Sequence, residues 1–188
     1  MAKRTANHQT VSGKQYFDSD VQLGGNTGSS LGSGFTAGYY HSWVETFGNV
    51  AKYSIMIDLT GAHSTDTLND IIGTEDTANA HIGQVPDEAG TIFAARWTCL
   101  EAPAGGEVDI DLNSATEGTL AEDSLITAGT ETVLFARAGD WAIQDVKTAF
   151  AALPGVGQYL YLSVGTNSSP TAGDYSAGQF LIEFWGAV

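Results

Sequence analysis

The sequence predicts an all-β fold, an antiparallel β-sandwich or jelly-roll-like body of about eight strands preceded by an extended, glycine-rich N-terminal arm. Short runs rich in β-branched and aromatic residues recur from residue 39 to the end of the chain. Clusters of Gly, Pro, Asn and Asp separate these runs, and several runs alternate in the period-2 pattern of half-buried strands. The 188 residues are enough for one sizeable domain. We therefore expect an arm over residues 1–38 and a β-sandwich or jelly-roll domain over residues 39–188.

The arm is expected to be extended because of its composition. The stretch "GGNTGSSLGSGFTAG", residues 24–38, contains six glycines, which makes ordering costly in conformational entropy. The preceding stretch "YFDSDVQL", residues 16–23, nevertheless carries apolar side chains that could anchor the arm. We predict that the arm gains order by lying on a partner, and folding back on its own domain is the alternative. The predicted partner-binding residues are Lys3, Arg4, Lys14, Tyr16, Phe17, Val21 and Leu23.

The strands of the body are predicted from their alternation and their boundaries. In "KYSIMIDL", Tyr53, Ile55, Ile57 and Leu59 would share one face of a strand. The terminal run "FLIEFWGAV" is apolar on nearly both faces, which predicts a central strand or one covered by a neighbouring subunit. The eight predicted strand runs cover residues 39–47, 51–59, 80–86, 91–100, 107–113, 131–138, 158–165 and 178–186.

The stretch "DWAIQDVKTAFAALPG" is the one candidate for a helix. Trp141, Val146, Phe150 and Leu153 fit a helical period loosely, and the Pro-Gly pair that follows would end the helix. A strand in this stretch is the open alternative. We therefore expect little helix outside residues 140–153.

The stretch "GGEVDIDLNSAT", residues 105–116, places oxygen-bearing side chains at every second position, namely Glu107, Asp109, Asp111 and Asn113. An EF-hand loop that began at Asp109 would need Gly at its sixth position and Glu at its twelfth, but Ser114 and Leu120 stand there. The apolar residues between the acids instead favour the solvated face of a strand. A loosely bound cation on that face stays open, since side chains two apart point the same way.

Catalytic groups are not indicated by any motif. The histidines, His8, His41, His63 and His81, are scattered without zinc-binding spacing, and the chain has neither a G-x-S-x-G nor a phosphate-binding glycine loop. The single Cys99 lies between apolar neighbours, as expected for a buried thiol. Acids are plentiful, but on an acidic body they usually serve solubility. We predict no catalytic, cofactor-binding or metal-binding residue and no enzymatic activity.

Charge is unevenly distributed. Residues 1–17 hold Lys3, Arg4 and Lys14 and no acid, whereas the rest of the chain holds all 22 acids and the remaining four basic residues. An acidic body argues against nucleic-acid binding. The N-terminus lacks the apolar run of a signal peptide, and no stretch of about 18 apolar residues predicts a membrane span.

Four segments carry a resemblance to a known group of proteins. The segments "AKYSIMIDL", "TCLEAPAGGEVDIDLNSATEGT", "QYLYLSVG" and "AGQFLIEFWGA" resemble small virion structural proteins of marine tailed bacteriophages. The similarity covers about residues 43–188 and leaves out the glycine-rich arm. These motifs mark a family and carry no catalytic residue over.

The resemblance implies a non-enzymatic protein made in the host cytoplasm and located on the virion. A decoration (cement) protein on the capsid surface is the expected role, with the major capsid protein and copies of itself as partners and a trimer as one arrangement. Arms and multivalent binding would give such a protein its avidity on a lattice. The alternatives are a tail or neck component, or a fibre-associated β-sandwich that binds a host glycan through aromatic side chains.

Overall fold

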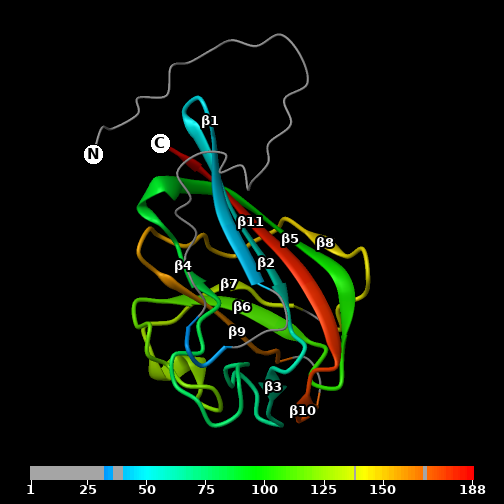
Figure 1. Cartoon of the computed structure of the whole chain (residues 1–188). Helices are drawn as coiled ribbons and strands as arrows, with labels where there is room; N and C mark the ends of the chain where they lie inside the picture. Colours follow the sequence, from blue (N-terminus) through cyan, green and yellow to red (C-terminus); the bar gives the residue numbers. More distant parts are fainter. Residues whose placement is uncertain (1–31, 36–39, 138, 167–168) are drawn as a thin grey trace, which may run out of the picture.

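The computed structural model describes residues 32–35, 40–137, 139–166 and 169–188. Two antiparallel sheets pack face to face in this part of the chain, which confirms the predicted all-β sandwich (Figure 1). Each of the eight predicted runs contains a strand. The helical segments of the described chain are two three-residue 3₁₀ turns, Asp87–Ala89 and Ile126–Ala128. Within these described ranges, no helix is long and apolar enough to cross a membrane.

The larger sheet has five strands and contains both the first and the last long strand of the body. The C-terminal strand lies at its centre, which confirms the prediction made from its two apolar faces. Figure 1 shows the long strands of this sheet running side by side, with the chain end close to the β1–β2 hairpin. In sheet order the strands are β1 (Tyr40–Phe47), β2 (Val50–Asp58), β11 (Ala177–Ala187), β5 (Thr91–Ala104) and β8 (Val146–Lys147).

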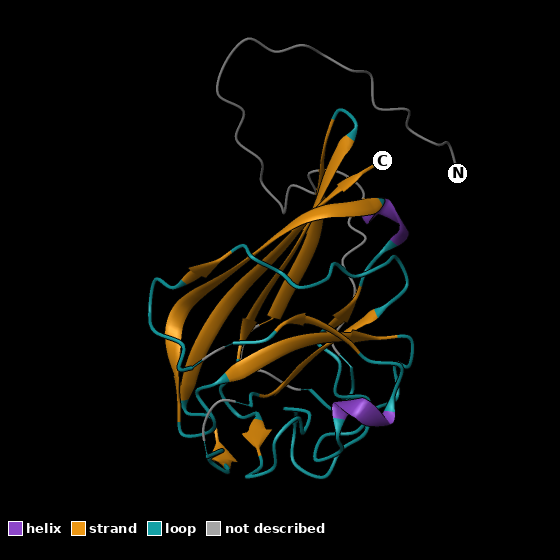
Figure 2. Cartoon of the chain, turned by 180° about the vertical axis from the view of Figure 1, so that it is seen from behind, coloured by secondary structure: helices purple, strands orange, loops and turns teal. Residues whose placement is uncertain are grey.

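The second sheet has four shorter strands, and a separate two-stranded ribbon lies at the end of the sandwich away from the β1–β2 hairpin (Figure 2). The two-residue strands of the ribbon, like β8, are too short to leave a periodic signal in the sequence. In sheet order the second sheet contains β4 (Gly83–Gln84), β9 (Tyr159–Val164), β6 (Ile110–Ala115) and β7 (Thr132–Phe135), and the ribbon contains β10 (Gly173–Asp174) and β3 (His63–Ser64).

The core fills the space between the two sheets. Tyr53, Ile55, Ile57 and Leu59 are all fully buried, as their alternation predicts. An aromatic cluster surrounds Trp97, whose ring lies 4.5 Å from that of Trp141 and 5.3 Å from that of Phe180. The second sheet adds buried aliphatic side chains, namely Ile110, Leu112, Leu134, Leu160, Leu162 and Val164.

Part of the expected arm is packed into the body. Phe35 is fully buried in the main core, and the backbone N–H of Thr74 donates to the carbonyl oxygen of Gly34 at 2.7 Å. A Cβ on Gly34 would lie 2.0 Å from the carbonyl oxygen of Ala78, so this close approach requires glycine. Residues 32–35 therefore belong to the body. Their glycine content had predicted that they belong to an arm ending at residue 38.

The helix considered for residues 140–153 is absent, and its alternative, a strand, is present only as β8. The segment is held by bonds to its neighbours: the Trp141 indole N–H donates to the carbonyl oxygen of Ile110 at 2.9 Å, and the Ala151 N–H donates to that of Leu134 at 2.8 Å. These two bonds to the second sheet, together with the pairing of β8 with β5 in the larger sheet, override a helical pattern that is weak in the sequence.

The prediction of a solvated face for the acidic row is wrong, although β6 confirms the strand. Every residue of β6 is buried, and Glu107, Asp109, Asp111 and Asn113 are each at most 4% exposed. The outer face of the four-stranded sheet is covered by loops that form a second small core around Ile71, Ala80, Ala115, Ile126 and Tyr161. Alternation separates the two faces of a strand, but it does not show whether another layer covers the polar one.

Candidate functional site

The residues predicted to bind a partner lie outside the described part of the chain. These are Lys3, Arg4, Lys14, Tyr16, Phe17, Val21 and Leu23, and their role stays a prediction. The surface of the described body therefore has to be searched for a partner's binding site.

One edge of β5 is incompletely paired. Along its other edge, β5 pairs with β11 from Thr91↔Ala187 to Ala104↔Ala177. On the incompletely paired edge, β8 covers only Trp97 and Thr98, and Cys99 exchanges backbone bonds with the segment just before β8. Within the described chain, Thr91–Arg96 have no backbone hydrogen-bond partner on this side. An open strand edge of this kind is a template for another extended chain.

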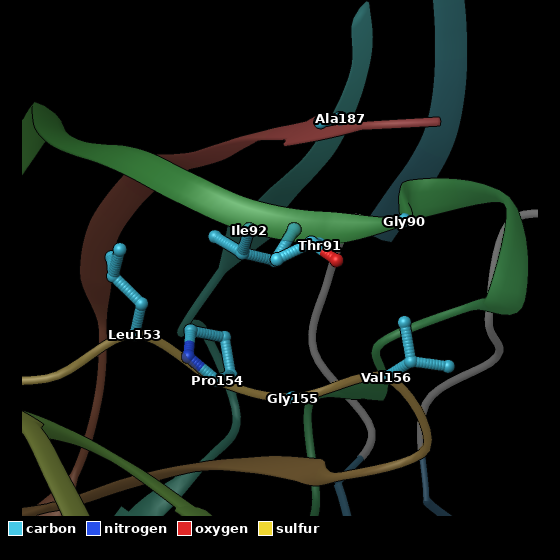
Figure 3. Close-up of a pocket in the computed structure, with 8 residues that line it drawn as sticks. All are labelled: Gly90, Thr91, Ile92, Leu153, Pro154, Gly155, Val156 and Ala187. Atoms are coloured by element: carbon cyan, nitrogen blue, oxygen red, sulfur yellow. The ribbon is translucent and has the colours of Figure 1, made fainter.

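A groove runs beside this open edge because the chain after β8 diverges from β5. The segment crosses to the other sheet, where Ala151 bonds to β7 through Leu134. The space left between this segment and β5 forms two adjoining hollows of about 470 and 440 Å³, which share Leu153. Figure 3 shows the first hollow, with Thr91 and Ile92 on one side and Leu153–Val156 on the other. We call these two hollows and the open edge of Thr91–Arg96 the edge groove.

Large apolar side chains line the edge groove and remain exposed. Phe93 is 55% exposed, Val156 42% and Leu153 37%, so solvent reaches much of their surface. Phe150 forms the inner wall, where its ring also packs against Phe184 of the core at 6.3 Å. A contiguous group of such side chains on a charged body is typical of a surface that contacts another protein.

A charged network marks the outer side of the edge groove. Nε and Nη2 of Arg96 lie 2.7 and 2.5 Å from Oε2 of Glu183, and the Arg96 guanidinium lies 5.6 Å from the ring centre of Trp185. Lys52 Nζ lies 3.7 Å from Oε1 of Glu183 and 2.6 Å from Oε2 of Glu45. The hydrogen bond from Lys52 is the main influence that lowers the pKa of Glu45. Arg96 is thus paired with Glu183, but its side chain is 43% exposed and its guanidinium has further N–H groups that can donate to another acceptor beside the groove.

The tryptophans divide between core and surface. Trp97 and Trp141 belong to the core, whereas Trp43 and Trp185 are partly exposed. The strand register places Trp43 opposite Ser54 and Trp185 opposite Lys52, which puts both on the outer face of the five-stranded sheet. His41 stacks on Trp43 with ring centres 5.1 Å apart. This outer face is the part of the described surface that could offer aromatic rings to a sugar.

The buried acidic row has structural partners. Glu107 accepts backbone N–H bonds from Asp109 at 2.8 Å and Thr171 at 2.6 Å, which ties two loops together. Asp111 accepts a bond from the Arg137 N–H at 2.5 Å, while burial, with the nearby charges of Asp109 and Glu131, raises the pKa of Asp111 to about 7. Among the described residues, no group of three or more His, Cys, Asp or Glu side chains is placed to hold a metal ion.

Cys99 and the described histidines have ordinary surroundings. The Cys99 thiol is fully buried, and burial raises its pKa to about 11, so it is a core residue as predicted. His63 Nδ1 lies 2.9 Å from a carboxylate oxygen of Asp174, and His81 packs against Tyr159 with ring centres 4.9 Å apart.

The edge groove was not predicted from the sequence, and the pattern around Phe93 gives only part of it. Ile92 and Phe93 are consecutive large apolar residues, and consecutive residues of a strand point to opposite faces. A register shift in the β5–β11 pairing lies at this point, between Trp185 and Gly186. Strict alternation with the buried Ala95 and Trp97 would place Phe93 inside, so its exposure depends on this register shift and, like the divergence of the segment after β8, could not be inferred.

Comparisons of this chain with known protein families, with curated proteins and with solved structures found no match.

Proposed function

We propose that this chain is a non-enzymatic structural protein of a phage virion. Its role is that of a capsid decoration (cement) protein, which binds the lattice of the major capsid protein and stabilises the head. The observation that carries the proposal is the edge groove, where exposed apolar side chains lie beside an open strand edge. Such a surface suits an extended segment of a neighbouring chain in an assembly. The resemblance of residues 43–188 to virion proteins supports the same role.

Binding to a lattice would be multivalent. The N-terminal residues Lys3, Arg4 and Lys14 would add salt-sensitive attraction to acidic neighbours, and the apolar residues that follow them would anchor the chain. Each contact can be weak, since many copies on one particle give high avidity. Any binding to the assembled shell, in preference to its dissociated subunits, stabilises the shell.

The first test is reconstitution on capsids that lack this protein. We expect the full chain to co-sediment with capsids and to raise the temperature at which they lose integrity. Deletion of residues 2–31 should leave the melting temperature of the free protein unchanged but weaken capsid binding by about tenfold or more. The deletion stops before Gly32 because Phe35 belongs to the core.

Two other results of the capsid-binding test would contradict the proposed function or the proposed role of residues 2–31. A full chain that does not bind capsids would contradict the proposed function. A truncated chain that binds as well as the full chain would show that the body alone makes the interface. Charge reversal at Lys3, Arg4 and Lys14 in the full chain is the matched variant, and it should reduce binding most at low salt.

A second function is favoured by the outer face of the five-stranded sheet. Trp43 and Trp185 lie there beside the network of Arg96, Glu183 and Lys52, so ring faces and charged hydrogen-bonding groups occur together. This combination suits a tail-, neck- or fibre-associated module that binds a host glycan. Glycan binding by the isolated protein that is lost in Trp185→Ala would favour this alternative.

A further inference from the structure

We propose that the edge groove of one copy binds residues 16–23 of a second copy as an added β-strand. This inference deepens the proposed function, since it names the partner of one surface. It leaves Lys3, Arg4 and Lys14 available for the capsid protein. The open edge of Thr91–Arg96 offers the backbone groups with which a strand can pair, and the groove beside it provides the room.

The two faces of an added strand would meet different surroundings. Ala95 and Trp97 of β5 point into the sandwich, whereas Arg96 lies on its outer side. A strand added in the plane of the sheet would therefore place one face against Phe150 and Leu153, and the other face beside Arg96.

The stretch "YFDSDVQL" has the alternation that these surroundings require. As a strand, residues 16–23 would present Phe17, Val21 and Leu23 on one face, with Asp18 and Asp20 on the other. The apolar face would cover the exposed groove side chains, and the acidic face would lie beside the Arg96 guanidinium. The match therefore rests on apolar contact, with hydrogen bonds from the exposed part of the Arg96 guanidinium to an Asp side chain as a second contribution.

Eight residues, 24–31, lie between this stretch and the described body. The body begins at Gly32, whose N–H donates to the carbonyl oxygen of His81 at 2.8 Å. Residues 24–31 can span at most about 30 Å when extended. We infer that the strand comes from a second copy and not from the same copy, and this point rests on the proposed function. A capsid lattice holds copies side by side, and a strand donated from one copy to the next would link them.

Thiol cross-linking between two variants of the full chain tests the inference without capsids. One variant carries Val21→Cys and the other carries Val156→Cys, a position that is 42% exposed at the groove. The native Cys99 is fully buried, so it competes little for a short bis-maleimide reagent. We expect mixed variants to form a cross-linked heterodimer at least about fivefold more than a control pair in which Leu68→Cys, 39% exposed in a loop, replaces Val156→Cys.

A second substitution tests the apolar contact. Phe17→Asp in the Val21→Cys chain should abolish the excess cross-linking, whereas Thr5→Asp, outside the stretch, should leave it unchanged. The inference is overturned if the heterodimer does not exceed the control pair. It is also overturned if a cross-link forms only within a chain that carries both cysteines, because the donor would then be the same copy.

The results also separate this inference from the proposed function. Cross-linking in solution together with failure to bind capsids would support strand exchange and contradict the capsid role. Capsid binding without the cross-link would leave the capsid role intact and overturn strand exchange.

Discussion

Trp97→Ala is expected to lower the free energy of unfolding by about 3–5 kcal/mol, because it removes the largest fully buried side chain and leaves a cavity between the sheets. The indole packs against Trp141, Phe135 and Phe180, with ring centres 4.5, 5.7 and 5.3 Å away. Chemical denaturation of the full chain measures the change directly. The melting temperature should fall by roughly 10 °C or more.

Two matched variants test whether the stability lost in Trp97→Ala comes from the central position of Trp97 in the core. Trp97→Phe should cost less than Trp97→Ala, since it keeps most of the ring and removes an indole N–H that has no hydrogen-bond partner in the described structure. Phe47→Ala, at a position 66% exposed on β1, should change stability by at most about 0.5 kcal/mol. Equal losses from Trp97→Ala and Phe47→Ala would contradict the placement of Trp97 at the centre of the core.

Asp111→Asn is expected to raise the free energy of unfolding at pH 8 by up to roughly 4 kcal/mol. Burial is the main cause that raises the pKa of Asp111 to about 7 in the folded protein, and the charges of Asp109 and Glu131 add to it. Ionisation of this carboxyl therefore opposes folding at high pH. The Asn side chain keeps an oxygen that can accept the Arg137 N–H bond.

The pH dependence gives the sign of this effect. Below about pH 4 the carboxyl is protonated in both the folded and the unfolded chain, so wild type and variant should be about equally stable. From about pH 4 to pH 7 the unfolded chain loses the proton first, and the wild type should lose stability relative to the variant. Above pH 7 the difference should stay constant.

Denaturation at pH 4, 6 and 8 checks this prediction. Asp87→Asn, at an exposed position on the first 3₁₀ turn, is the control and should show little difference at any of these pH values. An effect of Asp111→Asn that is the same at all three pH values would contradict the buried, protonated carboxyl.

The fold could be predicted because its signals are local. Alternation in β2 identifies Tyr53, Ile55 and Ile57 as core residues, and the two apolar faces of β11 identify a central strand. The same alternation over residues 107–113 led to a wrong prediction of exposure for Asp109 and Asp111, because the residues that lie against them, Gly165 and Arg137, are distant in the sequence. Whether the polar face of a strand is buried depends on which other segments pack against it, and the sequence of the strand alone does not show this.

The candidate site was less predictable than the fold. The edge groove exists because the segment after β8 leaves β5 and bonds to β7 at Leu134, a choice between two sheets that no local pattern specifies. Phe93 is exposed because of the register shift beside it, whereas its alternation with the buried Ala95 and Trp97 would place it inside. The arm residues predicted as anchors, among them Phe17 and Val21, lie outside the described chain, so their role depends on experiment.

The location of the protein on the intact virion tests the central claim most directly. If the chain is a phage decoration protein, as proposed, cryo-electron microscopy of the virions should show the sandwich at repeated positions on the head lattice. Strand density from a neighbouring copy should lie along Thr91–Arg96 in the edge groove. Density for the sandwich only in the tail or neck, or its absence from the particle, would contradict the account.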